Sequence, residues 1–127
     1  MYLIDTDILV SLGRGKVQIQ DQMSRVGLAS CLLSEISVAE LYVGVYKGRG
    51  QEAFVLFLEE HFKVVPISSA LKEYGQIRAI LEKHGNRLED NDLFIAATAL
   101  ANDYTLVTHN TRHFSRIPGL KLEDWMA

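Results

Sequence analysis

Short apolar runs alternate with longer amphipathic segments along the whole chain, and this alternation constrains the fold more than any other feature of the sequence. Apolar runs of strand length lie at residues 2–4, 28–33, 64–67 and 105–108, and a last brief strand is expected around residues 121–122. Strands that alternate with helices favour a parallel sheet with helices on both faces. The pattern therefore predicts a three-layer α/β/α domain whose central sheet is mainly parallel.

The segments between these runs have the spacing of helices. Ser34 or Ser37 can cap the third helix, and Ser68 or Ser69 can begin the fifth, which Gly85 ends. The third and fourth helices are expected to form a hairpin. The expected helices include residues 8–12, 17–26, 38–45, 51–61, 71–81, 93–101 and 110–117.

The size and composition of the chain indicate a single folded domain. The chain has 127 residues, close to the usual size of one domain, so one domain over residues 1–127 is expected. Hydrophobic side chains make up 48% and charged side chains 23%, which is typical of a folded protein and excludes intrinsic disorder. The net charge of −3 excludes a protein that coats nucleic acid through bulk positive charge. Any polyanion must therefore be bound by a local group of basic residues.

Two further features predict a cytoplasmic protein that does not enter a membrane. Cys31 is the single cysteine, so the chain cannot form an intramolecular disulfide, and its first residues lack the basic and apolar stretches of a secretory signal. No apolar stretch reaches the roughly 20 residues that cross a bilayer.

Side chains with oxygen ligands stand near the expected strands at four places far apart in the sequence. Asp5 follows the first strand, and Glu40 lies in the helix after the second. Asp92 begins the helix before the fourth strand, and Asn110 follows that strand. Ligands of parallel sheets collect beyond the carboxyl ends of the strands, so these groups are expected at one edge. Carboxylates that meet there repel one another unless a cation lies between them, and oxygen ligands suit Mg²⁺ or Mn²⁺.

Each of these residues also has an ordinary structural explanation. Asp5 and Asp92 can cap helices, whose N-termini favour acidic side chains. Glu40 can complete a capping box with Ser37 or lie on a solvated face, although its apolar neighbours indicate a half-buried position. Asn110 can be a turn residue. Taken one at a time, these residues do not decide between a structural and a catalytic role.

Four sequence blocks, taken together, resemble a known family. They are the start MYLIDTDILV, the segment SVAELYVG, the run DLFIAATAL, and LVTHNTRHF with the end IPGLKLEDW. In this order and at this spacing, the blocks resemble the PIN-domain ribonucleases of the VapC toxin type. The resemblance spans almost the whole chain and implies a PIN-like fold.

The resemblance implies a role for each matching residue. Asp5, Glu40 and Asp92 match the three main acidic residues of the family, which hold Mg²⁺ or Mn²⁺ at the scissile phosphate and are the expected catalytic groups. Thr6, beside the first acid, is expected to orient that acid or a water and to contact the substrate. Asn110 is the expected neutral metal ligand.

The block after the fourth strand departs from the family. Relatives often carry an acid there, whereas this chain has Thr108, Asn110 and His113, and the number of metal ions stays open for that reason. His113 can approach a phosphate, but a packing or surface position is the favoured interpretation. Asp7, where relatives often have asparagine, is either an auxiliary acid or a charge in the first turn of a helix.

The implied reaction is endonucleolytic hydrolysis of RNA by a metal-activated water, which predicts products with 3′-hydroxyl and 5′-phosphate ends. Arg14, Arg87 and Arg112 lie in loops expected at the carboxyl edge of the sheet and are the favoured substrate-binding residues. Single-stranded loops of a structured RNA, such as tRNA or rRNA, are the expected target because their bases are accessible. Less favoured basic candidates, each explained as well by a solvated surface position, are Lys16, Lys47, Arg49 and Arg116.

The resemblance also implies protein partners. It implies a homodimer, a small VapB-like antitoxin, and higher assemblies of toxin with antitoxin. The antitoxin of this family covers the acidic pocket with its C-terminal segment, and a basic side chain that enters there competes with Mg²⁺. Aromatic residues of the third and fourth helices form either a binding face or part of the core, namely Tyr42, Tyr46, Phe54 and Phe57.

Two other functions remain open from the sequence. In the first, the protein is a non-catalytic RNA-binding or assembly module of PIN-like fold, the acids are helix caps, and no divalent ion is required. In the second, Asp5 is the phosphate acceptor of a phosphatase or receiver-like domain, although no lysine follows a late strand.

Overall fold

The computed structural model describes residues 1–127 and contains a five-stranded parallel sheet with the strand order β3-β2-β1-β4-β5. The strands are β1 (Tyr2–Ile4), β2 (Cys31–Ser34), β3 (Lys63–Val65), β4 (Thr105–Val107) and β5 (Lys121–Glu123). The strand β1 lies at the centre, where Leu3 pairs with Leu32 on one side and with Leu106 on the other. Every neighbouring pair of strands is parallel, which confirms the predicted sheet.

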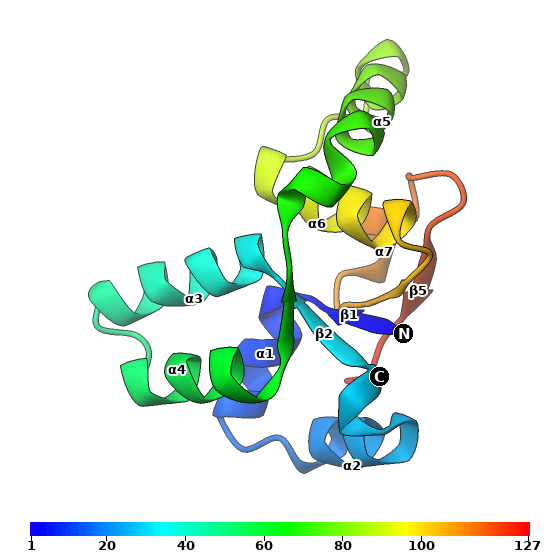
Figure 1. Ribbon diagram of the computed structural model, residues 1–127. Helices are drawn as coiled ribbons and strands as arrows, with labels where there is room; N and C mark the ends of the chain where they lie inside the picture. Colours follow the sequence, from blue (N-terminus) through cyan, green and yellow to red (C-terminus); the bar gives the residue numbers. More distant parts are fainter.

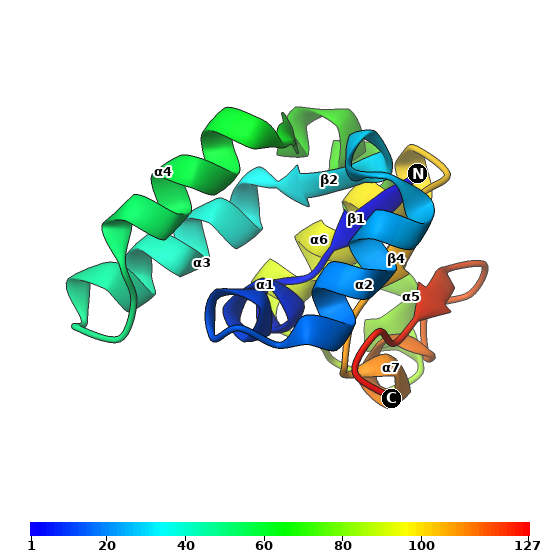
Figure 2. The same ribbon diagram turned by 90° about the horizontal axis from the view of Figure 1, so that it is seen from below.

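Helices cover both faces of this sheet (Figures 1 and 2). None of them is long and apolar enough to cross a membrane. They are α1 (Thr6–Gly13), α2 (Val17–Val26), α3 (Glu35–Tyr46), α4 (Glu52–His61), α5 (Leu71–Lys83), α6 (Asp90–Ala101) and α7 (Thr111–Phe114).

Two hydrophobic cores lie on the two faces of the sheet. Successive residues of a strand point to opposite faces, so β1, β2, β3 and β4 each contribute to both cores. Leu3 and Leu32 pack with residues of α5 and α6 on one face. Ile4 and Leu33 pack with residues of α1, α2 and α4 on the other. The three-layer architecture predicted from the sequence is therefore confirmed.

The second strand begins three residues later than predicted. Gly27 follows α2 with a φ of 91°, in the left-handed region that glycine adopts without strain. Leu28–Ser30 then form a turn of 3₁₀ helix before β2. Leu28 is exposed, so the apolar run 28–33 does not correspond to one buried strand.

The third strand ends at Val65 rather than at residue 67, because Pro66 has no N–H to donate to a neighbouring strand. Ile67–Ala70 form a second 3₁₀ turn, in which the Ser69 hydroxyl donates to the Pro66 carbonyl at 2.8 Å. The helix α5 follows this turn at Leu71, so Ser68 and Ser69 lie in the 3₁₀ turn before the helix and do not begin it as predicted.

The helices α3 and α4 form the predicted hairpin, which extends beyond the carboxyl ends of β1 and β2 (Figure 2). The helix α1 follows β1 directly, and α3 follows β2 directly. Because β1 and β2 are parallel neighbours, the first turns of α1 and α3 lie at the same edge of the sheet. This edge is where the polar residues singled out in the sequence gather.

The central strands should tolerate little loss of volume. Leu106→Ala removes a side chain that is fully buried in β4, and we expect the free energy of unfolding to fall by about 2–5 kcal/mol. Leu56→Ala on α4 is the matched control, because Leu56 is 52% exposed, and it should change stability by less than about 0.5 kcal/mol. Urea unfolding of both variants measures the difference, and equal losses would contradict the assigned burial.

Candidate active site

Asp5 lies at the carboxyl end of β1 and is the one acidic side chain that the fold buries, with 6% of its surface exposed. Its Oδ1 accepts a hydrogen bond from the Thr6 N–H at 2.8 Å, so Asp5 does cap α1. Its Oδ2 accepts a hydrogen bond from the Thr108 hydroxyl, also at 2.8 Å. The Thr108 hydroxyl oxygen in turn accepts the Asn110 N–H at 3.0 Å, which leaves the hydroxyl proton directed at Asp5.

The surroundings of Asp5 disfavour its negative charge. Burial raises the pKa of the Asp5 carboxyl to about 7, and the charges of Asp7 and, more weakly, Asp92 act in the same direction. The hydrogen bonds from Thr108 and Thr6 oppose this shift. Asp92 therefore lies near enough for its charge to act on Asp5, although 87 positions of sequence separate the two acids.

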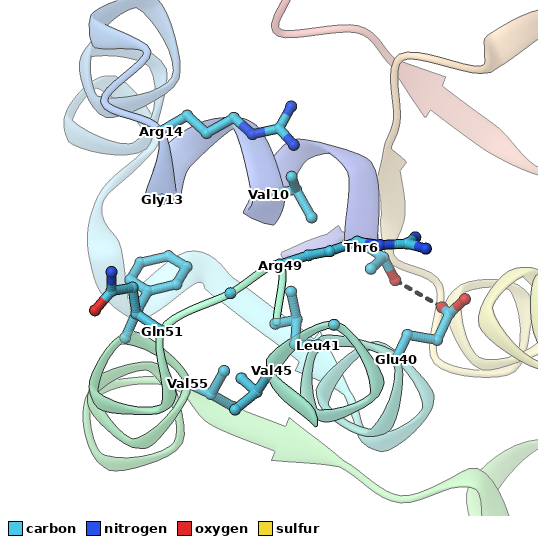
Figure 3. A pocket seen from close by; sticks show the side chains of 13 residues that line it. Thr6, Val10, Gly13, Arg14, Glu40, Leu41, Val45, Arg49, Gln51 and Val55 are labelled. Atoms are coloured by element: carbon cyan, nitrogen blue, oxygen red, sulfur yellow. Dashed lines mark hydrogen bonds between the residues drawn. The ribbon is translucent and has the colours of Figure 1, made fainter. Parts of the chain in front are cut away.

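Hydrogen bonds of Thr6 connect Glu40 with Asp5. The Thr6 Oγ1 lies 2.7 Å from the Glu40 Oε1 and 3.0 Å from the Ser37 Oγ. An ionised carboxylate only accepts, and the Thr6 hydroxyl has one proton, so Thr6 donates to Glu40 and Ser37 donates to Thr6. Figure 3 shows the bond from Thr6 to Glu40, and because the Thr6 N–H donates to Asp5, this one threonine links two of the three predicted acids.

The capping-box explanation of Glu40 was wrong. The cap of α3 is Ser34, whose hydroxyl oxygen accepts the Ile36 N–H at 3.1 Å. Ser37 is fully buried inside the helix and contacts Thr6 instead. The sequence could have pointed to Ser37 only through its spacing of three residues from Glu40, which a capping box explains equally well.

Asp92 lies in the first turn of α6, because the helix begins at Asp90 and Glu89 occupies the cap position. The Asp92 Oδ2 is 3.1 Å from the Nε2 of His113, and both side chains are half-buried. His113 also packs edge-to-face against the ring of Phe114, as the favoured packing interpretation predicted. Its imidazole therefore contacts both a core side chain and one of the predicted metal-ligating acids.

Asp7 also faces the site. Its carboxylate accepts hydrogen bonds from the N–H groups of Ile8, at 2.7 Å, and His109, at 3.1 Å. Burial raises the pKa of Asp7, and these two hydrogen bonds oppose the shift. Asp7 lies in the first turn of α1, as one interpretation predicted, and its charge also acts on Asp5.

A pocket of about 440 Å³ opens beside Thr6 and Glu40, between α1 and the α3–α4 hairpin (Figure 3). Arg14, at the end of α1, and Arg49, in the turn between α3 and α4, line it from two sides. Apolar side chains form its floor, namely Val10, Leu41, Val45, Phe54 and Val55.

The other predicted substrate residues lie outside this pocket. Arg87 lines a separate small pocket with residues of α5 and α6. Arg112 is exposed on α7, directly before His113. Asn110, the predicted neutral metal ligand, is exposed as well, and its backbone N–H donates to the Thr108 hydroxyl. Arg49 was a less favoured candidate, and only the fold of the hairpin brings it beside Glu40.

The donor set fits a hard divalent cation that keeps part of its water. No three Asp, Glu, His or Cys side chains converge closely enough to enclose a metal ion by themselves. Mg²⁺ usually takes one or two carboxylates from a protein and retains several waters. The buried Asp5 carboxylate beside other acids lacks a basic partner, and a cation would favour its charged form.

The raised pKa of Asp5 predicts a pH dependence of stability. Its folded-state pKa of about 7 lies above the ordinary value of 3.8, so the folded state binds the proton more tightly. The contribution of Asp5 to stability is therefore largest at low pH and is lost as the pH rises toward 7. Asparagine does not titrate, so the Asp5→Asn variant does not lose stability in this way. The free energy of unfolding of the variant minus that of the wild type should therefore increase by about 3 kcal/mol from pH 5 to pH 8.

Urea unfolding without divalent cations measures this difference across the pH range. Asp21→Asn, which removes an exposed acid on α2, is the matched control and should follow the wild-type profile. Parallel profiles for Asp5→Asn and the wild type would show that the folded protein already ionises Asp5 at pH 5.

Comparison with known proteins identifies the family of this chain. Residues 2–120 match the family model of the PIN domain. Ribonuclease VapC2 of Rickettsia felis is 33% identical over 132 aligned positions that cover 98% of each chain. The tRNA(fMet)-specific endonuclease VapC of Shigella flexneri is 27% identical over 98% of this chain and 97% of that protein.

A solved structure extends the similarity to the fold. The complex VapBC-1 from nontypeable Haemophilus influenzae contains a chain that superposes with a TM-score of 0.86 and is 31% identical, covering 99% of this chain and 98% of that one. The PIN-domain model covers most of the sequence. The relative from Rickettsia felis, which is aligned over nearly its full length and is more than 30% identical, is a VapC ribonuclease. The chain therefore belongs to the PIN-domain family and, within it, to the VapC-type ribonucleases.

Proposed function

We propose that this protein is the toxin of a toxin–antitoxin pair, a metal-dependent endoribonuclease that hydrolyses structured RNA. The observation that carries the proposal is the buried Asp5. Hydrogen bonds of Thr6 link it to Glu40, and Asp92 lies close enough for its charge to act on the Asp5 carboxyl. The names of the relatives supply the substrate class. Because the Shigella flexneri relative is a tRNA(fMet)-specific endonuclease, tRNA is the first substrate to test.

Asp5, Glu40 and Asp92 are the residues that would hold Mg²⁺ or Mn²⁺, directly or through the waters that the cation retains, with Asn110 as a neutral ligand. When bound, such a cation lowers the pKa of water and neutralises charge that develops on a phosphate. The protein's own side chains hold and orient the acids. Thr108 holds Asp5 in place through the hydrogen bond from its hydroxyl to the Asp5 Oδ2.

Two further side chains orient the other two acids through hydrogen bonds. The Thr6 hydroxyl fixes Glu40, and the His113 imidazole fixes Asp92. Arg14, Arg87 and Arg112 are the proposed contacts to RNA phosphates, because guanidinium groups bind phosphate oxygens in pairs.

The partners follow from the same family. The solved relative from Haemophilus influenzae is a VapBC complex, and we infer a small VapB-like antitoxin for this chain. A basic side chain of that antitoxin at the acidic edge would compete with the cation. Tyr46 and Phe57 are 77% and 48% exposed on the α3–α4 hairpin, so core packing does not explain them, and self-association of the toxin would cover exposed apolar surface of this kind.

The antitoxin-free protein should cleave RNA in the presence of Mg²⁺ or Mn²⁺ and should lose this activity when a chelator is added. Asp5→Asn and Asp92→Asn should each lower the cleavage rate by about 100-fold or more, because the cation contributes several kcal/mol of charge stabilisation in the transition state. Initial rates on end-labelled tRNA, resolved on gels, measure the effect.

The products and a control separate this mechanism from its alternatives. We expect 3′-hydroxyl and 5′-phosphate ends, whereas a 2′,3′-cyclic phosphate would identify the ribose hydroxyl as the nucleophile. Asp21→Asn should keep the wild-type rate. Cleavage that survives both active-site substitutions would reject the site, and RNA binding without any cleavage would favour the non-catalytic module.

Expression in a bacterial host without the antitoxin tests the toxin role separately. We expect growth to stop within a few generations of induction and to continue when Asp5→Asn or Asp92→Asn is expressed at the same level. Growth curves with immunoblots of protein level provide the measurement. Normal growth with an enzyme that is active in vitro would instead indicate a housekeeping nuclease.

A further inference from the structure

We propose that the pocket between α1 and the α3–α4 hairpin binds one unpaired nucleotide of the RNA, next to the phosphate that is cleaved. The base would lie on the apolar floor, and the neighbouring phosphates would contact Arg14 and Arg49. This inference rests on the proposed ribonuclease function and names a substrate-binding site within it.

The first argument is position. Thr6 and Glu40 belong both to the acidic edge and to the lining of the pocket, while Gly13 and Gln51 lie toward its other end (Figure 3). An RNA strand with one phosphate at the acids therefore has its adjacent nucleotide at the pocket. Single-stranded nucleotides can enter such a site because their bases are not held in a duplex.

The second argument is the shape and chemistry of the floor. The volume of about 440 Å³ lies in the range of pockets that hold small organic ligands. Phe54 packs directly on the backbone of Gly13, where an added Cβ would lie 2.8 Å from its ring. The ring is therefore a supported wall of the pocket, and aromatic and apolar side chains are surfaces on which bases of any identity stack.

The third argument is charge. Arg14 and Arg49 are exposed, and neither takes part in an ion pair within the chain. The only acid in the lining is Glu40, which already accepts the Thr6 hydroxyl. Two guanidinium groups above an apolar floor match a ligand that has both a flat base and phosphates. An apolar protein segment would cover the floor but would leave both cations without partners.

Gly44 supplies a direct test of occupancy. It lines the pocket from within α3, and a Cβ added there meets no atom within 4 Å. Gly44→Leu therefore fills the pocket without a clash against the backbone. Leucine and alanine both favour a helix over glycine, so Gly44→Leu and Gly44→Ala should unfold at or above the temperature of the parent protein.

The experiment measures binding of a fluorescent single-stranded RNA decamer of mixed sequence by anisotropy. The full chain carries Asp5→Asn, so that binding is read without cleavage. Gly44→Leu should weaken binding about tenfold, the effect of losing one stacked base. Arg49→Gln should weaken binding and reduce the slope of log affinity against log salt by about 0.7, the value for one phosphate contact on a single strand.

Lys83→Gln is the matched control, because it removes one positive charge from the exposed end of α5 and should leave RNA affinity unchanged. Unchanged affinity in both Gly44→Leu and Arg49→Gln would overturn the proposal. So would a loss of affinity for the antitoxin with RNA binding intact, since the pocket would then be a protein-binding groove. Failure of the ribonuclease function is a separate result, seen as wild-type protein that cleaves no RNA with any divalent cation.

Discussion

The hydrogen bond from the Thr108 hydroxyl to the Asp5 carboxylate holds the acidic edge of this protein together. Parallel pairing of β1 with β4 places Ile4 beside Val107, so the residues that follow the two strands meet although 103 positions separate them. The backbone continues the contact, because the Asp5 N–H donates to the Val107 carbonyl at 2.8 Å. The Thr6 N–H donates to the same carboxylate, and the Thr6 hydroxyl then connects this buried group with Glu40.

At neutral pH the ionised Asp5 carboxylate lowers the stability of the fold. A residue with a purely structural role would have no reason to carry this cost. Its burial and its acidic neighbours raise its pKa, and strongly shifted groups of this kind concentrate at functional sites. The fold offsets part of the cost through the first turn of α1, whose N–H groups and dipole favour negative charge. A cation at the edge would offset more of it.

The α3–α4 hairpin determines what lies next to these acids. It carries Glu40 on its first helix and Arg49 in its turn, so one supersecondary unit supplies both an acid of the site and a basic wall of the pocket. This arrangement lets a chain with a net charge of −3 offer local positive charge to a polyanion. The same geometry leaves Tyr46 and Phe57 on the outer surface of the hairpin.

The sequence by itself determined the alternation of strands and helices and singled out Asp5, Glu40 and Asp92, because periodicity and strand-end positions are local patterns. It misplaced the start of β2 and the end of β3, where the backbone of Gly27 and the missing N–H of Pro66 outweighed the apolar pattern. Only the tertiary structure decided that His113 meets Asp92, that Ser37 and Thr6 hold Glu40, and that Arg49 reaches the pocket. These contacts join distant segments, and their geometry depends on how helices pack on the sheet, which no local pattern of residues encodes.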